Sequence, residues 1–182
     1  FAALKQRLEQ DKDLEWWTIG MSLLARFQQS EDVPGALITA HKTARQCMSK
    51  YIGSQGAKQC AAWASRIEEP EWSVQSMKSD DAQKRSIRLS YKNLKKMRFS
   101  AWKVDAQSHA LSNEGRQYGR GPKSVSEYVK GDLLDTKPSY SWTVSLPPTR
   151  DYKTHTQHVK TNITERGDYV IVAHRNDRPD GE

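Results

Sequence analysis

Two histidines and two aspartates have spacings that could support metal binding or acid–base chemistry. His155 and His158 form an HxxH pattern, and Asp132 and Asp135 bring two carboxylates close together along the chain. Imidazole and carboxylate groups bind metals, but residues three apart in a strand point to opposite faces. A metal shared by the two histidines would therefore require a bulge or a turn. We expect His155 and His158 to be surface histidines.

The familiar catalytic patterns do not occur in the sequence, which contains no HExxH, GxSxG, P-loop or dinucleotide-type glycine motif. The stretch GRQYGRG, residues 115–121, could hold an anion through backbone amides, but we interpret it as a loop with solvated charges. Asp151 precedes Tyr152, yet no base and nucleophile stand together in the sequence. We therefore predict that the chain is not an enzyme, with no catalytic, cofactor-binding or metal-ligating residue and no cofactor. The alternative is a site assembled from distant residues.

The two cysteines are too far apart for a CxxC motif, because Cys47 and Cys60 have twelve residues between them and no second pair completes a zinc site. Structural zinc is therefore excluded. The sequence leaves two alternatives open, a disulfide formed in an oxidising compartment and a pair of buried thiols.

The net charge is +7, from 29 basic and 22 acidic residues, so nucleic acid and anionic membranes must be considered as partners. The charges are scattered, however, and the densest basic run is only Lys92, Lys95, Lys96 and Arg98. We therefore expect no nucleic-acid partner and keep an electrostatic nucleic-acid binder as an alternative.

No apolar run reaches the roughly 18 residues of a membrane helix, and no signal pattern is present. Because the first residue is Phe1, we expect a piece of a longer protein.

Residues 1–69 show helical periodicity and predict a short antiparallel bundle or helical-hairpin array. Helices are expected over 2–10, over 14–29, from Asp32 as N-cap through Pro34 to a stop at Gly53, and over 56–67. The second helix is expected to direct Trp17, Met21, Leu24 and Phe27 to one side. The small residues of the later helices also fit tetratricopeptide-like pairs; they are Ala36, Ala40, Ala44, Ala61, Ala62 and Ala64. No 34-residue period repeats, so a bundle or spacer is favoured over a peptide-binding repeat.

After Pro70 the pattern changes to short alternating segments, which predicts a second domain over 70–182. Strands are expected near 72–76, 87–91, 97–101, 141–146, 154–161 and 168–173, with a turn at 92–95. The last of these is the most apolar and is expected to be a central strand buried on both faces. A helical interpretation of 94–101 is the alternative. A long polar insertion near 105–138, with a helix within 125–134, interrupts an antiparallel immunoglobulin-like β-sandwich.

Aromatic residues in the strands are expected to pack rather than to bind ligands. Trp102, Trp142 and Tyr169 each lie in an alternating pattern, which is typical of core or rim positions. The fold class predicted from residues alone is therefore α+β, with a helical part followed by a β-sandwich.

Three stretches resemble the N-terminal part of large bacterial alpha-macroglobulin family proteins. They are IEEPEWSVQSMKSDDAQKRSIRLSYKNLKKMRFSAWKVD, SWTVSLPPTRDYKTHTQHVKT and ERGDYVIVAH. In that family a helical region precedes the first macroglobulin-like domain, whose start carries an xNL turn between two strands. The matching positions are Tyr91, Asn93, Leu94, Phe99, Asp105, Trp142, Val144, Leu146, Pro147, Asp151, Tyr152, His155, Gly167, Tyr169 and Val170.

The resemblance implies a non-catalytic structural module of a periplasmic or envelope-associated protease trap, often a lipoprotein in bacterial defence. Its expected partners are other domains of the parent protein and the proteases that the parent captures. A membrane would be reached only through a lipid anchor outside this chain. The alternative is an adaptor that recruits another envelope protein without inhibiting proteases.

The sequence departs from the family pattern in two respects. It contains no Cys-Gly-Glu-Gln thioester motif and no recognisable bait segment. It also stops soon after the strand around Tyr169, where a closing strand is expected. An uncovered strand edge promotes unwanted pairing, so we predict that sequence beyond Glu182 or another part of the assembly covers that edge.

Overall fold

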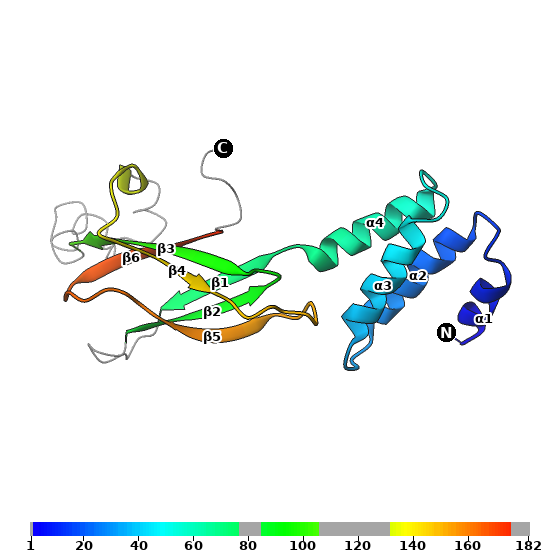
Figure 1. Ribbon diagram of the computed structural model, residues 1–182, viewed down its shortest axis with the longest axis horizontal. Coiled ribbons are helices and arrows are strands. Elements are labelled where there is room, and N and C mark those ends of the chain that lie inside the picture. The colour runs from blue at the N-terminus through cyan, green and yellow to red at the C-terminus, as the bar shows by residue number, and fades with distance from the viewer. Residues whose placement is uncertain (1, 77–84, 106–131, 176–182) are drawn as a thin grey trace, which may run out of the picture. The chain divides into compact units, whose positions relative to one another are not determined.

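The structure is a computed structural model that describes residues 2–76, 85–105 and 132–175. Over these residues the chain is α+β, with four α-helices, one short 3-10 helix and six strands (Figure 1). The helices are α1 (Ala2–Gln10), α2 (Trp17–Ser30), α3 (Ala36–Met48) and α4 (Gln55–Glu68), and η1 covers Asp132–Asp135. The strands are β1 (Glu71–Ser76), β2 (Ser86–Lys92), β3 (Lys96–Val104), β4 (Tyr140–Ser145), β5 (His155–Lys160) and β6 (Asp168–Arg175).

The chain divides into two compact units. The first contains the helices and the segments 91–93 and 148–155, and the second contains 73–90, 94–147 and 156–182. In the described part of the chain, no helix has the length and apolar character needed to span a membrane.

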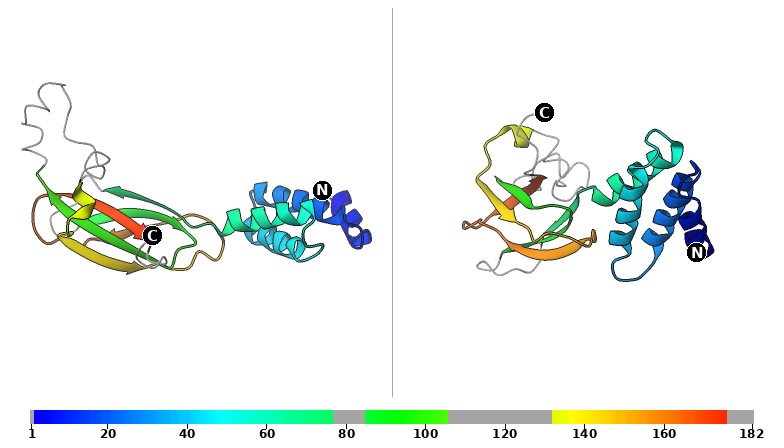
Figure 2. Two further views of the ribbon diagram at one scale, coloured as in Figure 1. Left: turned by 90° about the horizontal axis from the view of Figure 1, so that it is seen from above. Right: turned by 45° about the vertical axis from the view of Figure 1, so that its right-hand side comes forward.

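The helices form an antiparallel array in which α2 packs against α1, α3 and α4, and α3 packs against α4. Figure 2 shows α2, α3 and α4 side by side from two directions. The predicted helices are confirmed, and α1 has the predicted bounds. The start of α3 was predicted wrongly, because Gly35 with φ 79° precedes the first helical residue and Asp32 and Pro34 lie before it.

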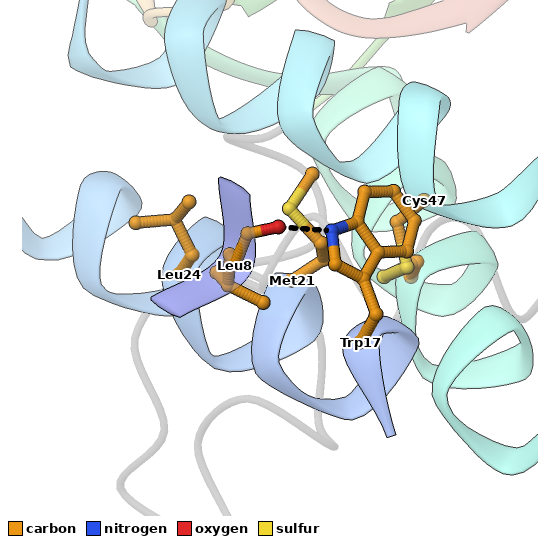
Figure 3. Packing of buried hydrophobic residues seen from close by; sticks show 6 residues of the cluster. Leu8, Trp17, Met21, Leu24 and Cys47 are labelled. Atoms are coloured by element: carbon orange, nitrogen blue, oxygen red, sulfur yellow. Dashed lines mark hydrogen bonds between the residues drawn. A yellow bond between two sulfur atoms is a disulfide. The ribbon is translucent and has the colours of Figure 1, made fainter. Parts of the chain in front are cut away.

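Trp17 organises the core between α1 and α2. Its indole Nε1 donates a 3.0 Å hydrogen bond to the Leu8 carbonyl oxygen, and its ring lies with Met21 and Leu24 in one cluster (Figure 3). This hydrogen bond satisfies the only polar atom of the buried indole, which would otherwise have no partner. α1 is a nine-residue helix, too short to be stable alone in water, so this contact supplies stability that its sequence lacks.

Cys47 of α3 and Cys60 of α4 form a disulfide within the same cluster, with their Cα atoms 6.0 Å apart. Both cysteines are fully buried. The two alternatives from the sequence are thereby decided in favour of the disulfide, because α3 and α4 bring the two residues to bonding distance.

The start of α4 lies directly against α2. Ser54 caps α4 by accepting a hydrogen bond from the Ala57 amide at 3.2 Å, and its hydroxyl lies 3.2 Å from the Thr18 hydroxyl. A Cβ on Gly56 would lie 2.4 Å from the Thr18 carbonyl carbon. Glycine is therefore what allows the two helix backbones to approach this closely.

The strands form two three-stranded antiparallel sheets, ordered β1-β2-β5 and β4-β3-β6. In the first sheet, the Ser90 hydroxyl of β2 lies 2.9 Å from the Thr156 hydroxyl of β5. Just beyond these two strands, the Thr161 amide donates to the Arg85 carbonyl at 3.0 Å. In the second sheet, Phe99 is paired with Trp142, and their rings stack with centroids 5.3 Å apart.

Burial follows the predicted alternation on β2. Ile87, Leu89 and Tyr91 are buried, and Arg88 is exposed. The turn after β2 is also confirmed, with Asn93 in the left-handed region at φ 56°. Asparagine tolerates this conformation better than other non-glycine residues, which suits it to the position.

β3 is buried on both faces, because Ser100 and Trp102 are buried as well as Met97, Phe99 and Ala101. It is the central strand of its sheet, with β4 on one side and β6 on the other. The strand interpretation of this segment is thereby confirmed over the helical one.

Two burial predictions for strands are wrong. All six residues of β1, an edge strand of its sheet, are exposed, including Trp72 and Val74. β6 was expected to be central and buried on both faces, but it is an edge strand in which Val170 alone is fully buried.

The helix expected within 125–134 and the glycine-rich stretch 115–121 lie largely outside the described residues.

Candidate functional site

The most connected polar cluster in the helical unit is centred on His41 of α3. The His41 imidazole Nε2 lies 2.6 Å from the Glu68 carboxylate at the end of α4. Its other nitrogen, Nδ1, lies 3.2 Å from the Tyr152 hydroxyl. The His41 and Tyr152 rings also contact each other, with centroids 4.7 Å apart.

Arg45 completes this cluster from the next turn of α3. His41 and Arg45 are four residues apart, so they lie on one face of the helix and reach the same carboxylate. Arg45 Nε donates to Glu68 Oε1 at 3.0 Å, and the guanidinium forms a second contact to the same oxygen. The hydrogen bond with His41 lowers the pKa of the Glu68 carboxyl, burial opposes this, and the contacts with Arg45 lower it further.

Tyr152 reaches this cluster from a tightly folded segment, residues 148–155. Tyr152 has a positive φ of 57°, and its amide donates to the Thr149 carbonyl at 3.1 Å. The Asp151 carboxylate accepts from the Lys153 amide at 3.1 Å and lies 2.9 Å from the His155 imidazole Nε2. The hydrogen bond with His155 is the main cause of the lowered pKa of Asp151.

Asn93 connects a second short segment of the unit to the end of α4. Its side-chain amide donates to the Ile67 carbonyl at 2.8 Å, which satisfies a carbonyl left without a helical partner. Its backbone amide donates to the Thr149 hydroxyl at 2.7 Å. Asn93 therefore connects the last turn of α4 to the segment that carries Tyr152.

A hydroxyl, an imidazole and a carboxylate in a hydrogen-bonded row could relay a proton, as in activated nucleophiles. The same bonds also satisfy partly buried polar groups, which is required for stability whether or not a substrate binds. Arg45 holds Glu68 as a charged partner of His41, and the Tyr152 ring contacts the imidazole at a tilted angle. The arrangement thus fastens residues 148–155 to α3 and α4.

A second polar cluster lies on the sheet β4-β3-β6. Lys103 forms an ion pair with Glu165 at 3.1 Å, and Tyr140 and Tyr169 meet edge to face with centroids 5.9 Å apart. A hydrogen bond with Thr164 lowers the pKa of Tyr140, whereas burial raises that of Tyr169. Both charged partners are more than half exposed, so the pair is screened by solvent and contributes little.

His155 and His158 lie on β5, and Asp132 and Asp135 lie in η1. His155 and His158 are both exposed, as predicted, and His155 is paired with Asp151 rather than with His158. Asp135 is exposed in η1. Over residues 2–76, 85–105 and 132–175, no three metal-ligating side chains come together. The packing roles expected for Trp102 and Trp142 are confirmed, since both are buried, and Tyr169 is half-buried.

Sequence reasoning did not find the cluster around His41. The one local signal is the spacing of His41 and Arg45 on one helix face, but Glu68 follows 27 residues after His41 and Tyr152 follows 111 residues after it. Separations of this size are not visible as a motif.

The Glu68 carboxylate leads to a prediction about acid stability. Because the pKa of Glu68 is lower in the folded chain than in the unfolded chain, the ionised carboxylate stabilises the fold. This contribution to the free energy of unfolding is complete above the ordinary glutamate pKa and is lost as the pH falls through the folded value. The side chain is 37% exposed, so we expect a contribution of only about 0.5–1 kcal/mol. The free energy of unfolding from urea titrations at pH 7 and pH 3 should therefore fall less with acidification in Glu68→Gln than in wild type.

The neighbouring Glu69→Gln variant is the matched control, because Glu69 is exposed and its carboxylate forms none of the contacts with His41 or Arg45 described above. It should retain the wild-type loss of stability between the two pH values. Equal acid sensitivity in Glu68→Gln and wild type would show that the cluster does not stabilise the unit.

Comparisons of this chain with protein-family models, with curated proteins and with solved structures find no match. The class that the fold defines is an α+β chain with a disulfide-linked helical array and two three-stranded sheets.

Proposed function

We propose that the chain is a non-catalytic structural module of a bacterial alpha-macroglobulin-like envelope protein and contributes to a protease-trapping assembly. The proposal rests on one observation, the location in the structure of the residues that resemble the family. Six of the fifteen matching residues are core positions, whereas Asp151, Tyr152 and His155 lie in the polar segment 148–155. Tyr91, Leu94, Phe99, Trp142, Leu146 and Val170 are each at most 7% exposed.

The finer part of the fold proposal is a macroglobulin-like β-sandwich. Each sheet contains a strand with buried apolar side chains: β2 buries alternate residues, and β3 is buried on both faces. The second compact unit contains most of both sheets. Two sheets with apolar faces are stable when those faces pack together, and this supports a sandwich.

An envelope location is supported by the disulfide. Cys47 and Cys60 are fully buried and bonded, and disulfides of this kind persist in the periplasm and outside the cell. The proposal therefore includes an oxidising compartment. The partners are other domains of the parent protein and, through the parent, proteases.

The test uses the complete parent protein and a parent lacking this region. Each is mixed with an active endopeptidase, and capture is measured as co-elution of the protease and as protection of the bound protease from a large protein inhibitor. We expect capture by the parent and its loss in the deletion variant. A parent that captures no protease would overturn the proposal.

The alternative function is an adaptor of the cell envelope without inhibitor activity. The observation that favours it is the exposed apolar strand β1, whose Trp72 and Val74 are 40% and 39% exposed. Exposed edge strands can pair with another chain. Recovery of one stoichiometric partner from envelope extract, together with no protease capture, would favour the adaptor.

A catalytic role for the His41 cluster has its own test. If the chain were a hydrolase using Tyr152, His41 and Glu68, His41→Ala and Tyr152→Phe would abolish turnover of the responsive substrate. We expect wild type and both variants to give the same background rate over a panel of ester, peptide and phosphate substrates. Turnover above background with a defined pH optimum, lost in both variants, would overturn the non-catalytic proposal.

A further inference from the structure

The solvent-facing side of α2 carries a row of large apolar side chains. Trp16, immediately before the helix, is 37% exposed, Ile19 and Leu23 are each 44% exposed, and Phe27 is 55% exposed. Their spacings of three, four and four residues place them along one face, opposite Trp17, Met21 and Leu24 in the core. We call these four residues the α2 stripe. Phe27 was expected on the same side of the helix as Trp17, Met21 and Leu24, and that prediction is wrong.

We propose that the α2 stripe is the interface of a homodimer in which α2 packs antiparallel to α2 of a second copy. The order of side chains along the stripe is aromatic, aliphatic, aliphatic, aromatic. A two-fold axis beside residue 21 therefore places Ile19 opposite Leu23 of the second copy, and Trp16 opposite Phe27. A two-fold interface must be complementary to itself, and this order meets that condition.

Charges beside the stripe fit the same axis. Glu15 lies in the turn that leads into α2 and Arg26 lies in the second half of the helix, and both are exposed, so the two charges flank opposite ends of the stripe. In the antiparallel arrangement, Glu15 of one copy lies opposite Arg26 of the other, twice per dimer. A parallel arrangement would place the two copies of each charge on opposite edges of the contact, so the Glu15–Arg26 pairs would not form. Charge complementarity therefore selects a second copy in antiparallel orientation.

The apolar area of the stripe limits the affinity expected for the dimer. Full burial of an aromatic side chain removes about 150–250 Å² from water, so four half-exposed side chains offer on the order of 400 Å² per copy. Stable interfaces bury about 800 Å² per partner. We therefore expect a reversible dimer with a Kd of about 1–100 μM rather than an obligate one.

The first experiment is sedimentation equilibrium of the 182-residue chain from about 1 to 500 μM, a range chosen to span this Kd. Wild type should pass from monomer to dimer over this range, and Leu23→Glu should remain monomeric. Ile52→Glu is the matched control, because Ile52 is 87% exposed and lies outside the stripe; it should dimerise like wild type. Because Leu23 faces solvent, circular dichroism should show both variants folded.

The second experiment reverses the charges. Glu15→Arg and Arg26→Glu should each raise the dimer Kd about fivefold, and the double variant should return it to near the wild-type value. A wild-type chain that is monomeric at every concentration would overturn the proposal. So would a dimer that persists in Leu23→Glu, a double variant weaker than both single variants, or a stripe that binds a different protein without self-association. These results are independent of protease capture by the parent protein.

Discussion

Replacement of Gly56 by alanine is expected to destabilise the helical unit by about 3 kcal/mol, at the upper end of the cost of overpacking. The new Cβ would lie 2.3 Å from the Thr18 hydroxyl oxygen and 2.5 Å from the Ile19 backbone nitrogen. Two of its three nearest atoms belong to the backbone of α2, so no side-chain rotation relieves the clash and the helices must separate. Urea titration followed by circular dichroism measures the loss. The higher helix propensity of alanine offsets at most about 1 kcal/mol.

Gly20→Ala is the matched control within the same array. Its Cβ would approach the Leu8 Cδ2 atom at 2.7 Å, and that atom is the far end of a flexible side chain. We expect Gly20→Ala to cost less than about 1 kcal/mol, because the Leu8 side chain can rotate and the helix gains propensity. Equal stability of Gly56→Ala and wild type would show that α2 and α4 do not cross as closely as the structure indicates.

Loss of the disulfide is expected to have an effect of similar size. The bond joins residues separated by 13 positions. Closing a loop of about 15 residues lowers the entropy of the unfolded chain, which raises its free energy by about 3 kcal/mol at 25 °C. A Cys47→Ala, Cys60→Ala double variant should therefore lose about 3 kcal/mol of unfolding free energy, measured by urea titration. It also loses packing in the cluster that contains Trp17 and Met21.

The reductant dithiothreitol provides the control for this prediction. It should lower the urea midpoint of wild type toward that of the double variant and leave the double variant unchanged. Wild-type midpoints that agree with and without reductant, while free thiol assays show complete reduction, would refute a stabilising role. A peptide linking Cys47 to Cys60 in a non-reduced digest would establish the pairing independently.

The helices were predictable because their signals are local. Apolar periodicity located all four helices, and it placed Met21 and Leu24 correctly in the core. Phe27 was misplaced because the pattern shows which residues are apolar, but not where neighbouring helices end. Neither α1, α3 nor α4 covers that part of α2, so the same helix has an apolar face toward solvent.

The strands illustrate the same limit in a different way. Alternation identified β2 and β3 and their turn, since each side chain direction follows from strand geometry. The position of a strand within its sheet is set by partners distant in the sequence. β6 is the most apolar segment and yet lies at an edge, whereas β3, with four charged or polar residues, is central.

By itself, the sequence determined the kinds of elements, their order and the turn at Asn93, because each depends on residues that are neighbours along the chain. Only the tertiary structure decided that Cys47 bonds to Cys60, that His41 meets Glu68 and Tyr152, and that one face of α2 is left uncovered. These features depend on how helices and segments pack, and the energy of that packing is distributed over many contacts rather than written in a local pattern.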